Sequence, residues 1–272
     1  MQRHRRLLAV AGALTVIAAS AGGWFVREWA RRGPKEASVP GAVERFRSSS
    51  TLPSSAARLV PTPGVYTFAG DGQEKLSFMA THQQQGRTLP ATVTHATNNC
   101  WRFEIEYNTF HRQTWNWCAR DGRLVEQGGS THQQFDFVAF KVDENSTVAC
   151  DPPFSIVDTA DRPGHTTTSS CRGHSTTSGT DMLARGTVKF IGAASIDVGG
   201  TAVPALHYHA DRTISGDQTG HEVSDFWFSV ANGMLLRNER DIRVISPAPA
   251  PLHTVTYTER GWFQLAALTP RS

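Results

Sequence analysis

The alternation of apolar and polar residues predicts β-strands over most of the chain after residue 63. Trp101, Phe103, Ile105 and Tyr107 alternate with polar residues without a break. A period of two residues is typical of a strand with one buried face. The same alternation returns near residues 115–117, 135–140, 206–210, 226–230 and 254–258, and a change of face near residue 138 predicts a bulge.

Turn signals separate these runs. Asp71-Gly72, Asp121-Gly122, Gly199-Gly200 and Asn232-Gly233 are residue pairs that tolerate the positive φ angles of two-residue hairpin turns. We therefore expect an antiparallel meander. The fold class predicted is mainly β, a large curved antiparallel sheet that forms a half-barrel or a sandwich, behind an N-terminal transmembrane helix.

The N-terminus indicates the compartment. Residues 1–6 are basic, residues 7–26 carry no charge, and Arg27 follows at once. An uncharged run of this length suits a single membrane span, which would leave residues 1–6 as a cytoplasmic tail and anchor the protein in the cell membrane. A cleaved signal peptide is the alternative, because residues 19–21 match an A-x-A cleavage site, and the protein would then be secreted.

Two further segments follow the apolar run. Residues 27–62 are rich in Ser, Ala, Pro and Arg, and we expect a flexible linker with at most a short helix at 43–47. Residues 63–272 then form the extracytoplasmic β domain.

The four cysteines agree with export. An even number of cysteines behind an export signal indicates disulfides, and four of them allow three connectivities. A hairpin over 100–119 would bring Cys100 opposite Cys118, so we predict this bridge. The bridge Cys150–Cys171 would then close the polar loop between them.

Composition and charge exclude some functions. The chain has 272 residues and a net charge of only +3, and seven of its 27 basic residues lie within the first 35 positions. The basic charge therefore flanks the apolar run and forms no groove for nucleic acid. No phosphate-binding loop, dinucleotide fingerprint or nucleophile elbow is found in the sequence, so we expect no cofactor.

Histidines and carboxylates are the residues considered for chemistry. His207 and His209 would share one face of a strand, and His221 on the next segment could reach them to hold zinc. The alternative is an ordinary solvent-facing row, because H-x-H lacks the spacing of closed metal sites. Glu104 and Glu106 also share a face, where an exposed, charge-neutralised surface is the simpler interpretation.

Aromatic residues offer a second kind of site. A curved sheet with many aromatics on its concave face could enclose an apolar ligand, although aromatics also dominate ordinary cores. The residues predicted to bind such a ligand are Trp101, Phe103, Tyr107, Trp115, Trp117, Phe226 and Phe228.

One segment resembles a known family. The stretches Asp225-Phe226-Trp227-Phe228 and Gly233-Met234-Leu235-Leu236-Arg237 are similar to the strand pair of lipoprotein-carrier domains of the localisation-factor type. The chain also resembles bacterial cell-envelope proteins with one N-terminal span and no assigned activity. The resemblance covers about residues 185–268 and implies a curved half-barrel that shelters an acyl chain or a lipoprotein. No binding residue is carried over.

The sequence thus predicts a membrane-anchored extracytoplasmic β domain that binds a lipid-like ligand or an envelope protein and catalyses no reaction. The alternatives are a secreted metal-dependent hydrolase that uses the histidines, and a purely structural envelope scaffold. The expected partners are the membrane, through the N-terminal helix, and a lipid or protein of the envelope, with no nucleic acid.

Overall fold

The computed structural model describes residues 33–49, 58–79, 82–136, 141–248 and 253–272. Residues 34–133 and 144–272 form one compact unit. The described elements are α2 (Val39–Ser48), β1 (Gly64–Leu76), β2 (Gln83–Gln84), β3 (Thr88–His95), β4 (Cys100–Asn108), β5 (His111–Arg120), β6 (Arg123–Asp136), β7 (Lys141–Asp158), β8 (Thr166–Ser175), β9 (Asp181–Val198), β10 (Thr201–Gly216), β11 (Thr219–Ser229), β12 (Leu235–Pro247) and β13 (Thr254–Leu265).

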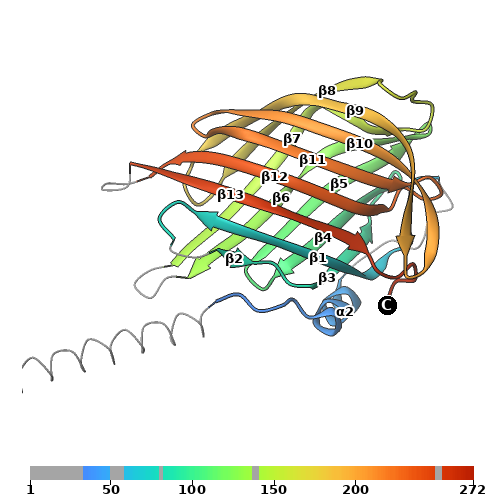
Figure 1. Cartoon of the computed structure of the whole chain (residues 1–272), viewed down its shortest axis with the longest axis horizontal. Coiled ribbons are helices and arrows are strands. Elements are labelled where there is room, and N and C mark those ends of the chain that lie inside the picture. The colour runs from blue at the N-terminus through green and yellow to red at the C-terminus, as the bar shows by residue number, and fades with distance from the viewer. Residues whose placement is uncertain (1–32, 50–57, 80–81, 137–140, 249–252) are drawn as a thin grey trace, which may run out of the picture. The chain divides into compact units, whose positions relative to one another are not determined.

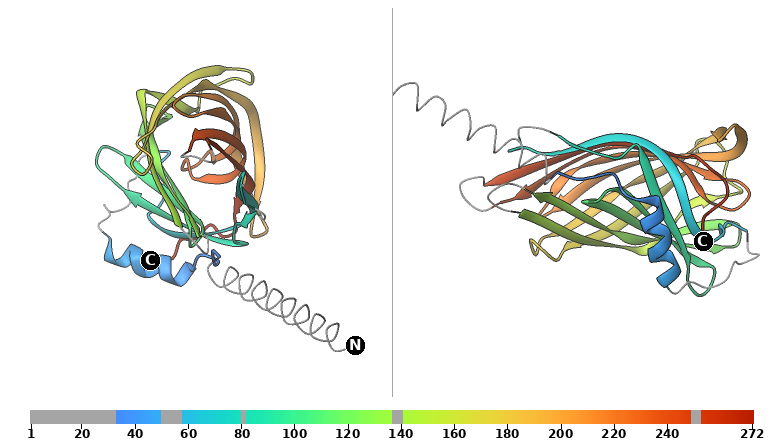
Figure 2. Two further views of the ribbon diagram at one scale, coloured as in Figure 1. Left: turned by 90° about the vertical axis from the view of Figure 1, so that its left-hand side faces the viewer. Right: turned by 90° about the horizontal axis from the view of Figure 1, so that it is seen from below.

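The strands form a closed antiparallel barrel. Neighbouring strands follow the sequence order from β3 to β13, as the meander prediction requires, and β1 lies beside β3 (Figure 1). β1 also pairs with β13, from Phe68 opposite Leu265 to Leu76 opposite Tyr257. This seam closes a barrel of 12 strands, to which β2 adds only a short pairing on β1 (Figure 2). The prediction of a half-barrel or sandwich is therefore wrong, whereas the mainly β class and the meander are confirmed.

The predicted alternation places apolar side chains on the inner wall. Along β4, Trp101, Phe103, Ile105 and Tyr107 are each at most 1% exposed, while the residues between them reach the outer wall. Burial of such large side chains contributes about 1.5–3 kcal/mol each. The register between β9 and β10 shifts beside His207 and Tyr208, where Ile191 is the extra residue on β9. Residues 206, 208 and 210 of β10 pair without interruption with Phe228, Phe226 and Ser224 of β11, and they lie in or against the core. The predicted common face of these three residues is therefore confirmed.

Glycines act as the turn signals predict at three of the four sites. Asp121-Gly122 and Gly199-Gly200 connect hairpins with positive φ at all four residues, and Gly233 has φ 70° between β11 and β12. Asp71-Gly72 instead lies inside β1, opposite Trp262 and Gly261. A Cβ at Gly72 would meet Oε1 of Gln85 at 2.5 Å, so this glycine permits a close approach and forms no turn.

The segment predicted as a linker is ordered in two places. α2 is longer than the short helix expected, its N-cap Ser38 accepts a hydrogen bond from Gly41 N–H, and its buried Val39, Ala42 and Val43 pack with Val65 of β1. Further along, Leu59 is buried in the barrel core, and its carbonyl accepts a hydrogen bond from Trp101 Nε1 at 3.2 Å. Residues 34–49 and 58–62 therefore belong to the folded domain.

Both predicted disulfides are confirmed. Cys100 bridges Cys118 across the β4–β5 hairpin, and Cys150 bridges Cys171 between β7 and β8. Residues 7–26 and the bulge predicted near residue 138 lie outside the described residues. None of the described helices has the length and apolar character needed to cross a membrane.

Candidate functional site

The seven aromatics predicted to bind an apolar ligand come together inside the barrel. They lie on β4, β5 and β11 and contact one another, with ring centroids 4.8 Å apart for Trp101 and Trp117 and 5.6 Å apart for Trp117 and Phe228. Phe263 of β13 lies 6.3 Å from Phe103 and 5.6 Å from Phe68. The rings thus fill this part of the interior with contacts between distant strands, as in a packed core.

A polar network occupies another part of the interior, around Glu74 of β1. Gln83 donates to Oε1 of Glu74 at 2.7 Å, and Gln133 donates to Oε2 at 2.9 Å. Nδ1 of His111 lies 3.0 Å from the same Oε2. Both Glu74 and His111 are at most 1% exposed, so the group is shielded from solvent.

Glu259 of β13 joins this network from the other side of the seam. Its Oε1 accepts from Gln85 at 3.0 Å and from Nε of Arg240 at 2.7 Å, and a second Arg240 nitrogen also contacts it. The Tyr257 hydroxyl lies 3.0 Å from Glu74 and 2.8 Å from Glu259. The Arg240 guanidinium lies 3.8 Å from the centroid of the Tyr107 ring. These partners hold two buried carboxylates, as buried charges require.

The pKa values in this network follow from burial and from the neighbours. Burial by itself raises the pKa of Glu74, but the charge of His111 and the hydrogen bonds from His111, Gln83 and Tyr257 outweigh it and hold the pKa below its ordinary value. Burial raises the pKa of Tyr257, and the Glu259 carboxylate raises it further. Glu74 therefore stays ionised and Tyr257 stays protonated at neutral pH.

Glu74, His111 and Glu259 also place three potential metal-ligand atoms within 4.8 Å of one another. However, Oε1 of Glu259 already accepts from Arg240 and Gln85, and Oε2 of Glu74 already accepts from Gln133. A cation here would lie beside the guanidinium of Arg240 and would displace these donors. The arrangement fits an ion-pair network better than a metal centre.

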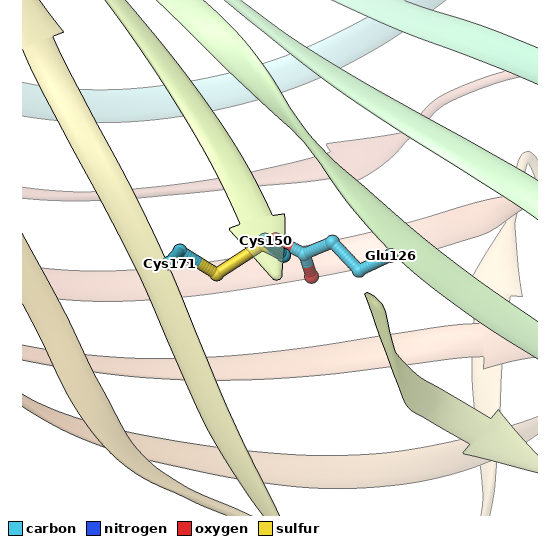
Figure 3. A group of neighbouring side chains, drawn as sticks. All are labelled: Glu126, Cys150 and Cys171. Atoms are coloured by element: carbon cyan, nitrogen blue, oxygen red, sulfur yellow. A yellow bond between two sulfur atoms is a disulfide. The ribbon is translucent and has the colours of Figure 1, made fainter. Parts of the chain in front are cut away.

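A third buried carboxylate, Glu126 of β6, lies beside the Cys150–Cys171 disulfide (Figure 3). Arg212 of β10 approaches Glu126 at 3.8 Å and Glu222 at 3.5 Å. Burial is the largest influence on Glu126, and together with the charge of Glu222 it raises the pKa despite Arg212 and a hydrogen bond from Trp117. Because the two sulfurs are bonded to each other, this group offers no thiolate for a metal or for catalysis.

The three histidines considered for zinc do not converge on one point. His207 and His209 both contact the Asp225 carboxylate, at 2.7 and 3.1 Å, whereas His221 pairs with Asp211 at 2.7 Å. Among the described residues, they do not form a group of three ligand atoms within 4.8 Å of one another. The His207 ring instead stacks on Trp227 with centroids 4.2 Å apart.

The carboxylate pair of β4 is placed on the outer wall. Glu104 is only partly buried, and Glu106 forms an ion pair with Arg45 of α2. The charge of Glu106 is thus neutralised on the outer wall, as the sequence interpretation predicts, and the ion pair connects α2 to β4.

Two shallow hollows lie on the outer wall beside the seam. One, of about 300 Å³, is lined by residues of β11, β12 and β13, including Asp225, Glu239 and Asp241. The other, of about 330 Å³, is lined by residues of β1, β2 and β13, including Asp71. Arg260, Gly261 and Trp262 line both hollows. We call this surface the Trp262 ridge: Trp262, Arg260 and Gly261 with the hollow on each side.

Charged side chains are fixed around the Trp262 ridge. Arg237 donates to Glu239 at 2.9 Å and to Gln264 at 2.6 Å, and its guanidinium lies 5.4 Å from the centroid of the Trp262 ring. Arg260 donates to Asp241 at 2.9 Å. Trp262 is 37% exposed, one of the few large apolar side chains described with this much exposure. Exposed tryptophan and arginine are residue types enriched at protein interfaces.

Comparisons with known proteins identify no family. No family model matches the chain, and no curated protein matches it. A search of solved structures finds the hypothetical lipoprotein YmcC from Escherichia coli (K12), at 12% identity and a TM-score of 0.38, covering 85% of this chain and 90% of that one. A likeness at this level carries no argument about function, and the resemblance to lipoprotein carriers stays a prediction.

Sequence reasoning did not find the Trp262 ridge or the Glu74 network. The alternation in Gly261-Trp262-Phe263 indicates that Trp262 and Phe263 point to opposite faces. It gives no sign that Trp262 lies opposite Asp71, because that pairing joins the first and last strands of the barrel.

Proposed function

We propose that this protein is a non-enzymatic binding module of the cell envelope that recognises a partner on the outer wall of its barrel. The observation that carries the proposal is that side chains of the barrel itself fill its inner wall. Aromatic rings pack against one another in one part, and a network of ion pairs and hydrogen bonds occupies another. Recognition is therefore assigned to the Trp262 ridge, where the hollows lie.

The compartment is part of the same proposal. Two disulfides favour an oxidising environment, and the basic and apolar N-terminus favours export with retention at the cell membrane. A partner of the envelope is then more consistent with the structure than a lipid held inside the barrel. Such a lipid would have to displace packed aromatic rings, each of which contributes to the stability of the core.

Native mass spectrometry of the full chain, exported to an oxidising compartment and purified in detergent, tests the proposal. We expect the mass of the oxidised chain alone once the detergent is removed in the gas phase. An adduct of lipid mass that disappears on denaturation would contradict the outer-wall assignment and favour the apolar ligand.

Elemental analysis of the same preparation tests the hydrolase alternative. We expect no stoichiometric metal. A metal present at one equivalent and lost in the double variant His207→Ala/His209→Ala would replace the proposal with a metal site on β10.

A further inference from the structure

The geometry points to a specific class of partner: we propose that the Trp262 ridge binds a cationic peptide segment, one that carries lysine or arginine side chains, of a partner protein. This inference rests on the proposed function, since it names the ligand of the same outer wall. It is carried by the charge around the ridge, by the free carboxylate oxygens and by the exposed indole.

The side chains around the ridge carry a net negative charge. Asp71, Asp225, Glu239 and Asp241 line the hollows, with Arg260 between the hollows and Arg237 beside the indole. Arg240 also lines one hollow, but its charge is paired with the buried Glu259, so the local formal charge is −2. The net charge of +3 of the chain comes from residues 1–35, and residues 36–272 hold 20 basic and 23 acidic residues. An acidic surface attracts cationic groups and disfavours anionic ones.

The local ion pairs leave acceptor atoms available. Both close contacts of Arg237 with Glu239 fall on Oε1, and both contacts of Arg260 with Asp241 fall on Oδ2. A carboxylate accepts hydrogen bonds at two oxygens. The second oxygen of each residue can therefore accept from a lysine ammonium or an arginine guanidinium of a partner, because Glu239 is 44% exposed and Asp241 is 53% exposed.

The indole of Trp262 adds a second attraction for a cation. A cation within about 6 Å of a tryptophan ring gains about 0.5–2 kcal/mol from the ring quadrupole. Arg237 already lies 5.4 Å from this ring, so the surroundings of the ring accommodate a guanidinium. The hollows on both sides of the ridge suit an extended chain that crosses Trp262 and places a side chain in each hollow.

Fluorescence anisotropy tests this inference. The full chain in detergent micelles is titrated into short labelled peptides, in which lysine alternates with glycine in one set and arginine alternates with glycine in the other. Matched peptides with glutamate or serine in place of the basic residue are the ligand controls. We expect saturable binding of the basic peptides only, weakened by salt between about 50 and 500 mM, as for exposed charges.

Variants locate the binding. We expect Trp262→Ala and the double variant Glu239→Gln/Asp241→Asn each to weaken binding about tenfold or more, from loss of the cation–π and charge contributions. Ile191→Ala is the matched control, since Ile191 is an exposed apolar residue of β9, and Glu104→Gln is the control for an acidic residue elsewhere on the outer wall. Both controls should change the affinity less than about twofold. Circular dichroism melting confirms that the variants are folded.

The outcomes separate this inference from the proposed function. Binding that survives Trp262→Ala and falls equally with Glu104→Gln would mean diffuse ionic attraction and would overturn the inference. A neutral oligosaccharide bound by the wild type and lost in Trp262→Ala would also overturn it, while the outer wall would remain the binding surface. A lipid adduct in the native mass spectrum would remove the proposed function itself, whatever the peptides do.

Discussion

Two buried glutamates of the barrel have pKa values shifted in opposite directions by their neighbours. Glu74 has His111, Gln83 and Tyr257 around it, and its pKa is lowered in spite of burial. Burial raises the pKa of Glu126, and the Glu222 carboxylate raises it further, because Arg212 approaches Glu126 only to 3.8 Å. The number of donors within hydrogen-bond reach decides the sign of the shift.

Replacing Glu126 with glutamine should stabilise the protein at neutral pH. Because the folded-state pKa of Glu126 is raised, the unfolded chain releases its proton at lower pH, and the wild type loses stability as pH rises above the ordinary carboxyl value of about 4. The glutamine variant lacks this loss. We expect a gain of about 1 kcal/mol at pH 8 and none at pH 3, measured by urea unfolding at both pH values. A variant less stable than wild type at pH 8 would show that the pair with Arg212 outweighs desolvation.

Replacing Glu74 with glutamine should have the opposite effect. The folded-state pKa of Glu74 is lowered, so its contribution is complete above the ordinary carboxyl pKa and is lost as pH falls through the folded value. We expect a loss of about 3 kcal/mol at pH 7 from breaking a buried ion pair. The difference from wild type should shrink as the pH is lowered below about 4, where the unfolded carboxyl is protonated. A pH-independent difference would assign the effect to packing and not to charge.

At the scale of elements, glycine allows adjacent strands of this barrel to approach closely. A Cβ at Gly186 of β9 would lie 1.9 Å from the carbonyl oxygen of Asp211 on β10, and one at Gly129 of β6 would lie 1.9 Å from the carbonyl of Thr114 on β5. These contacts are with backbone atoms, so no side-chain rotation relieves them. A sharply curved sheet has such glycines where strands bend.

We expect Gly186→Ala to destabilise the protein by about 2–3 kcal/mol, because the strands must separate to admit the methyl group. Gly41→Ala in α2 is the matched control. A Cβ at Gly41 would lie 3.4 Å from its nearest neighbour, Ser38 Cβ, so alanine should be tolerated. The higher helix propensity of alanine should stabilise the protein by at most about 1 kcal/mol. Thermal melting of both variants measures the contrast, and equal melting temperatures would refute the close-approach argument.

The two disulfides should contribute unequally. Their sequence separations of 18 and 21 residues are similar, so the chain-entropy contribution is about 3 kcal/mol for each. Cys150 and Cys171 are 5% and 3% exposed and belong to the core, whereas Cys100 is half-buried. We expect Cys150→Ala/Cys171→Ala to cost more than Cys100→Ala/Cys118→Ala, because removing the inner sulfurs also leaves a cavity. Urea unfolding of the two double variants measures this, and an equal loss would exclude the cavity contribution.

At the scale of the whole molecule, adjacent residues of β13 belong to the packed interior and to the Trp262 ridge. Phe263 points inward and is 0% exposed, and Trp262 points outward and is 37% exposed. Phe263 contacts Phe68, Phe103, Tyr107 and Trp115, which come from β1, β4 and β5. The seam strand therefore contributes both to closing the barrel and to the Trp262 ridge.

This arrangement predicts that two neighbouring substitutions have separable effects. Phe263→Ala should cost about 3–5 kcal/mol of stability, the usual cost of removing a core phenylalanine. Trp262→Ala should change stability by less than about 1 kcal/mol and should remove peptide binding. Chemical unfolding and the anisotropy assay measured on both variants check this. A large loss of stability in Trp262→Ala would indicate a structural role for that residue.

The sequence alone determined the strand pattern, three of the four turn sites and both disulfides. These features are local: alternation fixes which side chains share a face, and a hairpin brings Cys100 opposite Cys118 by its own register. The short helix expected at 43–47 is only part of α2, and the full length of α2 and the order at Leu59 were not predicted, because each is stabilised by contacts with the barrel and not by its own composition. His207 and His209 share a strand face, as predicted, and both contact the Asp225 carboxylate. His221 instead pairs with Asp211, so the three histidines do not form one metal site.

Only the tertiary structure decided that the sheet closes, and the Glu74 network and the Trp262 ridge depend on that closure. Closure pairs Glu74 with Glu259 and Asp71 with Trp262, across more than 180 residues of chain. No periodicity in one strand specifies a partner so distant in sequence, since the pairing depends on strand number, tilt and curvature summed over the whole barrel. The packed interior and the Trp262 ridge are therefore consequences of the closed fold, whereas the local pattern of residues determines the strands that compose it.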